Sequence, residues 1–122
     1  MLEKDLQQQI MDFAEMNGWL RMHQLPARTG TGGWATAVQG DVGFPDLVLV
    51  RPPRMIVVEL KQDGRYPGPE QRVWLEALAE VPGIETGVWR PKDWPQIEAA
   101  LRRDPRADSY ESRSSGEGAP AA

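Results

Sequence analysis

The chain has 122 residues, 40% of them hydrophobic, which is enough for one folded domain with one core but not for two. It contains no cysteine, which excludes disulfides, thiolate metal sites and a cysteine nucleophile. The formal net charge of -4 argues against nucleic-acid binding through a global positive field, so grouped arginines and bound divalent cations would have to compensate.

The amino-terminal segment is polar and acidic and has no apolar signal core. No later run approaches the roughly 18 apolar residues of a membrane span, so we expect a soluble cytoplasmic protein without a membrane partner. Apolar residues recur at helical spacing from Leu2 to Met16, and Gly18 follows as a C-cap. This pattern predicts a first helix.

The next two segments are predicted to be a short strand and a long loop. Residues 19–25 end at Pro26 and are expected to place Trp19, Arg21 and His23 on one side of a strand. Residues 26–43 contain five glycines and no apolar periodicity, which is typical of a surface loop.

A hairpin is predicted from two runs rich in β-branched residues, 46–50 and 55–60, which are separated only by residues 51–54. Both runs are apolar at nearly every position, as in strands that are covered on both faces. A second helix is predicted from Pro69 to about residue 81, where its apolar side chains, Trp74 among them, would pack on the core.

The remaining elements complete an α-β-β-β-α-β-α order. Residues 84–89 are predicted to form a strand, and Asp93 is expected to cap a last helix over 94–102. Strand, helix and strand in succession normally form a right-handed crossover, so strand 84–89 should lie parallel to strand 55–60 in a mixed sheet flanked by helices. Residues 104–122 are polar and charged and are predicted to be a disordered tail.

The register of the hairpin predicts an unusual pair of acids. If the turn is symmetric, Asp46 lies opposite Glu59, with Cβ atoms about 4.5–5.5 Å apart, where like charges are destabilising. A divalent cation relieves the repulsion most directly, and a shared proton or solvent are the alternatives. A bulge or an odd-length turn would instead put the two acids on opposite faces.

Lys61 strengthens the functional interpretation of this pair. Residues two apart on a strand project to the same face, so the lysine ammonium should lie beside Glu59. Two carboxylates with an adjacent lysine are suited to metal-assisted hydrolysis of a phosphodiester, in which a cation activates water and the lysine stabilises negative charge.

Three motifs now carry a family resemblance: Gly43-Phe-Pro-Asp46, then Glu59-Leu-Lys61, then Gln71 in the second predicted helix. In this order and spacing they resemble the PD-(D/E)XK nuclease superfamily. More specifically, the chain resembles its VRR-NUC family, from Glu3-Lys-Asp-Leu-Gln7 to Trp89-Arg-Pro91. The resemblance implies a restriction-endonuclease-like α/β fold over residues 1–103 and a metal-dependent DNA endonuclease activity.

The resemblance also implies roles for individual residues. A divalent ion, Mg²⁺ or Mn²⁺, would be held by Asp46, Glu59 and the backbone carbonyl of Leu60. Lys61 would lie near the attacking water, and Gln71 would orient that water or the lysine.

Glu3, in the first predicted helix, would complete the acidic cluster. Asp5 and Glu15 lie on the same helix, however, and no spacing argument singles out Glu3. Small stand-alone members of the family look like homodimers that act on branched or four-way-junction (Holliday junction) DNA, often in phage or prophage settings. The chain is therefore expected in a bacterial or phage-infected cell, with branched DNA and a second copy of itself as partners.

Contacts with DNA are predicted at five further residues. Arg28, Arg65 and Arg72 are candidates for phosphate contacts. His23 should lie near the acidic cluster, and Trp34, in the glycine-rich loop, could stack on a base or pack across a dimer. The loop's glycines do not match a P-loop or dinucleotide fingerprint, so no nucleotide cofactor is expected.

Each catalytic candidate also has a purely structural interpretation. Asp46 could simply be an acid that follows a proline, and Glu59 and Lys61 could form an ordinary ion pair at a strand end. Gln71 could be a first-turn helix residue, and Glu3 could offset the helix dipole. Two alternative functions therefore stay open: a module of the same fold that binds nucleic acid or protein without cutting, and a nuclease of the same fold that acts on RNA.

Overall fold

The structure is a computed structural model that describes residues 1–24, 27–28, 32, 34–35 and 38–103, with only the backbone described at 27–28 and 34–35. The predicted tail, 104–122, lies outside the described residues. The elements in chain order are α1 (Glu3–Met16), β1 (Leu20–His23), β2 (Ala27–Arg28), β3 (Trp34–Ala35), β4 (Leu47–Arg51), β5 (Arg54–Leu60), α2 (Pro69–Ala79), β6 (Ile84–Trp89), η1 (Pro91–Asp93) and α3 (Trp94–Leu101).

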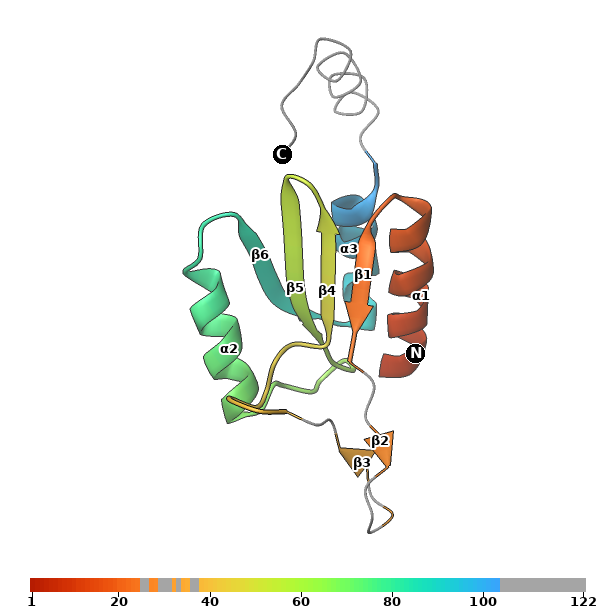
Figure 1. The fold of residues 1–122 in the computed structure, drawn as a ribbon. Helices are drawn as coiled ribbons and strands as arrows, with labels where there is room; N and C mark the ends of the chain where they lie inside the picture. Colours follow the sequence, from red (N-terminus) through yellow and green to blue (C-terminus); the bar gives the residue numbers. More distant parts are fainter. Residues whose placement is uncertain (25–26, 29–31, 33, 36–37, 104–122) are drawn as a thin grey trace.

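A four-stranded mixed sheet organises the molecule, in the order β1-β4-β5-β6 (Figure 1). The hairpin β4–β5 and the pair β1–β4 are antiparallel, whereas β6 runs parallel to β5. Helices flank this sheet: α1 and α3 pack together on one side, and α2 crosses from β5 to β6 on the other. The predicted mixed α/β architecture, the hairpin and the parallel crossover are confirmed.

Two local predictions need correction. The segment 26–43 is not entirely loop, because β2 and β3 form a small antiparallel pair in which Arg28 lies opposite Trp34. A 3₁₀ turn, η1, precedes the last helix. Asp93 occupies the N-cap position of α3 as predicted, but its carboxylate accepts a hydrogen bond from the Arg90 amide at 2.9 Å and so closes the preceding turn without bonding to α3.

The core lies between the sheet and the pair α1–α3. Alternate residues of the hairpin point into it, namely Leu47, Leu49, Ile56, Val58 and Leu60, together with Leu6, Ile10, Ala14, Ile97 and Leu101 of the helices. Trp19 closes one end: its indole N–H donates to the Leu101 carbonyl at 2.9 Å, and Arg51 lies over its ring at 4.7 Å from the ring centre. As predicted, β1 turns Trp19, Arg21 and His23 toward this side, where the Arg21 guanidinium donates to the Met11 carbonyl.

The opposite face of the sheet is covered only in part. Helix α2 lies over β5 and β6, and none of its residues, all of which the structure describes, is fully buried. Over β1 and β4 the face is open: Leu20 is 72% exposed and Met22 45%, and they lie opposite the half-buried Val50 and Val48. The prediction that both hairpin strands are covered on both faces is therefore right for most of β5 and wrong for β4.

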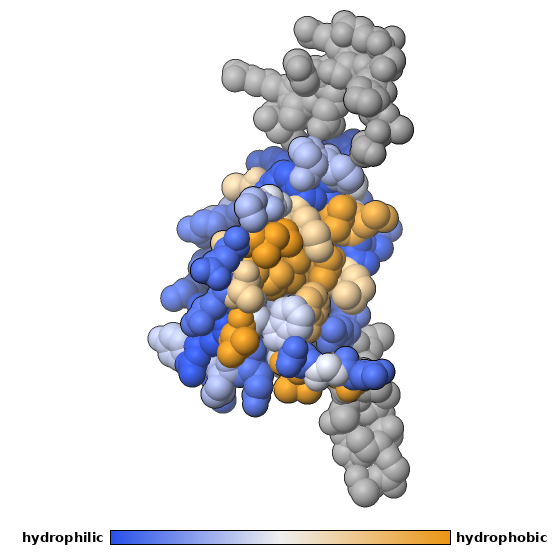
Figure 2. Space-filling model, turned by 60° about the vertical axis from the view of Figure 1, so that its left-hand side comes forward, coloured by the Kyte–Doolittle hydropathy of each residue, from blue (hydrophilic) through white to orange (hydrophobic). Residues whose placement is uncertain are grey.

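Figure 2 shows this open face as an apolar patch surrounded by hydrophilic side chains. A patch of this kind usually marks a surface that another molecule covers. Among the described residues, no helix has both the length and the apolar character needed to cross a bilayer.

Candidate active site

The hairpin has the register predicted from its turn. Val50 lies opposite Met55 and Val48 opposite Val57. Asp46 comes one residue before β4 begins, and its Oδ2 accepts a hydrogen bond from the Leu60 amide at 2.8 Å. The carboxylate of Asp46 therefore lies beside the end of β5, where Glu59 is the next residue.

Glu59 is a charged residue in an almost fully buried position, with 2% of its surface exposed. Burial, a hydrogen bond with Asp46 and the charge of Asp46 raise its pKa from 4.5 to about 9, and the positive charge of Lys61 opposes this shift. The raised pKa means that the Glu59 carboxyl favours its neutral form at neutral pH. The structure places together the two acids that the sequence predicted as a pair.

The two oxygens of Glu59 differ in their environment. Oε1 accepts a hydrogen bond from the Gln71 side-chain amide at 3.2 Å. Oε2 is buried and receives no hydrogen bond from any described residue. A buried oxygen without a donor is costly, so it must share a proton with Asp46 or bind a cation.

Gln71 serves the helix and the site at once. Its side-chain oxygen accepts a hydrogen bond from the Gly68 amide at 2.8 Å, which closes the first turn of α2, while its side-chain nitrogen donates to Glu59. The helical interpretation and the site interpretation of Gln71 are therefore compatible, because the capping bond aims the amide at the acid.

Lys61 follows directly after β5, and its amide donates to the Trp89 carbonyl at 3.1 Å. Its side chain lines a polar pocket together with Glu3. Because its charge lowers the pKa of both Glu3 and Glu59, the ammonium lies within electrostatic reach of both acids.

Glu3 is the acid of α1 that reaches this region. Burial raises its pKa above 4.5, and the charge of Asp46 raises it further. The other two acids considered on this helix are occupied elsewhere: Asp5 accepts from the Leu2 amide and Glu15 forms an ion pair with Arg21. Glu3 is thus the acid of α1 that interacts electrostatically with Asp46 and Lys61, and its role in the site stays a prediction.

The donor set fits a hard cation in part. No group of three acid or histidine side chains in the described segments is arranged to hold a metal ion, so Glu3 does not close a three-carboxylate cluster with Asp46 and Glu59. Two facing carboxyl groups, one with an oxygen that lacks a donor, are nevertheless the oxygen ligands that Mg²⁺ and Mn²⁺ prefer.

Gly43 explains why the Gly-x-Pro-Asp motif begins with glycine. Its φ is +97°, and a Cβ built there would lie 2.7 Å from the backbone carbonyl carbon of Glu70. The loop that carries Asp46 therefore packs directly on the first turn of α2, which carries Gln71. Only glycine permits both this backbone conformation and this close approach.

The other predicted site residues are less directly connected to the acids. His23 lies opposite Leu47, at the same end of the sheet as Asp46, but its Nδ1 is 2.8 Å from the Gln7 side-chain nitrogen. Arg65 lines the polar pocket beside Lys61, and Arg72 is exposed on α2. The side chains of Arg28 and Trp34 lie outside the described residues.

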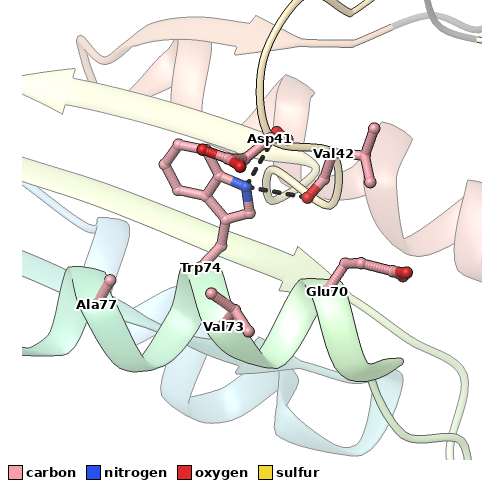
Figure 3. Close-up of a pocket in the computed structure, with 6 residues that line it drawn as sticks. All are labelled: Asp41, Val42, Glu70, Val73, Trp74 and Ala77. Carbon is pink, nitrogen blue, oxygen red and sulfur yellow. Dashed lines mark hydrogen bonds between the residues drawn. The ribbon is translucent and has the colours of Figure 1, made fainter.

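A second pocket, of about 370 Å³, lies away from the acid pair and is lined mostly by apolar surface between α2 and the loop before β4 (Figure 3). Trp74 forms one wall, and its indole N–H donates to the carbonyls of Asp41 at 3.3 Å and Val42 at 3.1 Å. The prediction that Trp74 belongs to the core is wrong, because the sheet face that it was expected to fill is only partly covered.

Sequence reasoning missed Tyr66, which lines the polar pocket with Lys61 and Glu3, and Arg90, which contacts it. The Arg90 guanidinium lies 5.2 Å from the centre of the Tyr66 ring. Nothing in the sequence pairs them, since they are far apart along the chain. Comparison of the chain with protein-family models and with curated proteins finds no match, so a function must be argued from this geometry and from the motif resemblance.

The raised pKa of Glu59 predicts a pH dependence of stability. Between pH 4.5 and about 9 the folded state keeps a proton that the unfolded state has released, so the free energy of unfolding should fall as pH rises, by up to about 1.4 kcal/mol per pH unit. Glu59→Gln should remove this slope when unfolding is measured in urea with EDTA between pH 5.5 and 9. Glu85→Gln is the control, because the pKa of Glu85 is lowered and its carboxyl group therefore titrates below this range. Equal slopes for the wild type and Glu59→Gln would contradict the buried acid pair.

A second prediction concerns the motif glycine. Gly43→Ala should lower the free energy of unfolding by about 1–3 kcal/mol, because it adds both an unfavourable φ and a clash with Glu70. Gly40→Ala is the matched control: its φ is +112°, but a Cβ there meets nothing within 4 Å. If the two variants lose the same stability in urea unfolding, the close packing of this loop on α2 is not what requires glycine.

Proposed function

We propose that the protein is a metal-dependent nuclease that hydrolyses phosphodiester bonds in DNA. The observation that carries the proposal is the pairing of Asp46 with the buried Glu59, whose Oε2 lacks a hydrogen-bond donor among the described residues, beside the lysine of the same strand end. A structural ion pair would not require an acid at 2% exposure whose pKa is raised by a neighbouring acid.

Asp46, Glu59 and the backbone carbonyl of Leu60 would hold the cation, as the motif resemblance implies. When bound, a divalent ion polarises the phosphate and lowers the pKa of water. A cation bound there would have to displace the proton that the raised pKa of Glu59 favours. Gln71 holds Oε1 of Glu59 in place, and the Lys61 ammonium is suited to stabilise the negative charge that develops on the phosphate.

We further infer that the fold is the restriction-endonuclease-like fold of the VRR-NUC family. The mixed sheet, the acid pair at one end of the hairpin and the glutamine in the following helix support this assignment. The same resemblance supports branched or junction DNA as the substrate. A non-cleaving binding module and an RNA nuclease are the outcomes that the following experiment would separate from it.

The nuclease proposal predicts cleavage of labelled flapped or four-way-junction DNA in the presence of Mg²⁺ or Mn²⁺, and none in EDTA. Lys61→Ala and Asp46→Asn should each reduce the rate by about 100-fold or more, as expected when a group that stabilises transition-state charge is lost. Lys92→Ala, an exposed lysine outside the site, should cut like the wild type. Binding of DNA without cleavage would indicate the binding module, and cleavage of RNA alone the RNA enzyme.

We also propose that the protein is a homodimer, with the apolar face of β1 and β4 as the contact. A second copy presents the same patch, and a two-fold axis would bring the two patches together.

Leu20→Lys should therefore shift the wild-type dimer to monomer in sedimentation-velocity experiments. Met16→Lys, at a side chain that is 81% exposed at the end of α1, should leave the dimer unchanged. A monomeric wild type, or a dimer that tolerates a lysine at residue 20, would rule out this interface.

A further inference from the structure

We propose that the polar pocket beside Lys61 binds one unpaired nucleotide of the substrate strand, with Tyr66 stacked on the base and Arg65 bound to a phosphate. The pocket has a volume of about 310 Å³ and is lined by Glu3, Lys61, Gln62, Arg65 and Tyr66. The inference rests on the proposed nuclease function, because it takes the Lys61 end of the pocket as the catalytic end.

The lining has the chemistry that a nucleotide needs. The Arg65 guanidinium offers a planar fork of donors that matches phosphate oxygens, and the Gln62 amide offers both a donor and an acceptor. The Tyr66 ring offers an aromatic surface on which any base can stack. Glu3 and Lys61 mark the side of the pocket that adjoins the carboxyl pair, so the phosphate belongs at the Arg65 side.

The Tyr66 ring is exposed to solvent but contacts a cation on one face. Its side chain is 77% exposed, and it is the one aromatic residue among the exposed large hydrophobic residues of the described chain. The Arg90 guanidinium lies over the ring at 5.2 Å from its centre. With a cation on one face and most of the side chain open to solvent, the ring has a free surface for a base.

The loop that carries Arg65 and Tyr66 is held in place before any ligand arrives. The Arg90 side chain donates two hydrogen bonds to the Arg65 carbonyl, from Nη2 at 2.7 Å and from Nε at 3.2 Å. The Arg65 amide closes a turn on the Gln62 carbonyl at 3.0 Å, and the Lys92 amide donates to Asp63 at 3.2 Å. Arg90 is therefore a positioning residue, and the site loses little entropy when it binds.

A stacking tyrosine selects for unpaired bases. A base inside continuous duplex is already stacked on its neighbours, so Tyr66 could reach it only after the base is flipped out, which costs unstacking energy. A nucleotide in a flap, a gap or a branch point is available without that cost. The pocket should therefore favour strands with an unpaired nucleotide next to the scissile phosphate over intact duplex.

Fluorescence anisotropy in EDTA tests the pocket separately from catalysis. The probes are a labelled single strand of about 12 nucleotides, a flapped duplex and a continuous duplex. Tyr66→Ala should weaken binding of the single strand and the flap by about 10-fold or more, and binding of the continuous duplex by less than about twofold. Tyr66→Phe should bind like the wild type, because the ring remains.

Two further variants, Arg65→Gln and Arg90→Gln, separate the other contributions, and two more serve as controls. Arg65→Gln should weaken all three probes, whereas Arg102→Gln, which removes an equal charge from an ion pair on α3, should weaken none. Arg90→Gln should reproduce the selective loss of Tyr66→Ala. Val73→Ala, at an exposed residue of α2, controls for nonspecific effects of surface substitution.

The outcomes are distinguishable from those of the nuclease proposal. If Tyr66→Ala binds every probe like the wild type, or loses single strand and duplex equally, the nucleotide pocket is wrong even if the protein cuts DNA with Mg²⁺. If the wild type cuts no DNA, and Tyr66→Ala selectively loses binding of the single strand, the nuclease proposal is wrong and the pocket stands as a binding site.

Discussion

Two carboxyl groups at the end of an apolar hairpin are the constraint on which the site depends. Glu59 is buried, its neighbour is Asp46, and burial together with that neighbour raises its pKa to about 9. The arrangement costs stability in the absence of a cation. Its surroundings are built to maintain it: the Leu60 amide holds Asp46, Gln71 holds Glu59, and Gly43 lets the loop approach α2.

The two faces of the sheet are covered unevenly by the helices. Helices α1 and α3 fill one face with a closed core, whereas α2 covers only the β5–β6 half of the other. Residues alternate along a strand, so Glu59 falls on the partly covered face while Leu60 enters the core. The acid pair therefore lies on the same side of the sheet as the open apolar surface of β1 and β4.

The proposed binding of nucleic acid would require this acidic protein to gather its positive charges locally. The net charge is -4, but Lys61, Arg65 and Arg90 meet where β5 and β6 end, around a loop tied down by hydrogen bonds. A short-range cluster of this kind binds a phosphate by contact, since charges separated by more than about 10 Å are screened at ordinary ionic strength. The same clustering brings Tyr66 under the Arg90 guanidinium.

The sequence by itself determined the features that depend on neighbouring residues. Helical periodicity predicted α1 and α2, and the short turn between two β-branched runs predicted the hairpin register, hence the side-by-side position of Asp46 and Glu59. Turn symmetry and side-chain alternation are local rules, so they hold before packing is known. The parallel crossover followed from the handedness that strand–helix–strand connections share.

Only the tertiary structure decided what depends on how distant elements pack. It placed Glu3 within electrostatic reach of Asp46, left Trp74 at a surface pocket, and paired β2 with β3 within the predicted loop. It also brought Arg90 to Tyr66, across a separation in sequence that no periodicity describes. The reason is the same in each case: the orientation of a helix or loop on the sheet is set by the summed packing of many side chains, which no local pattern contains.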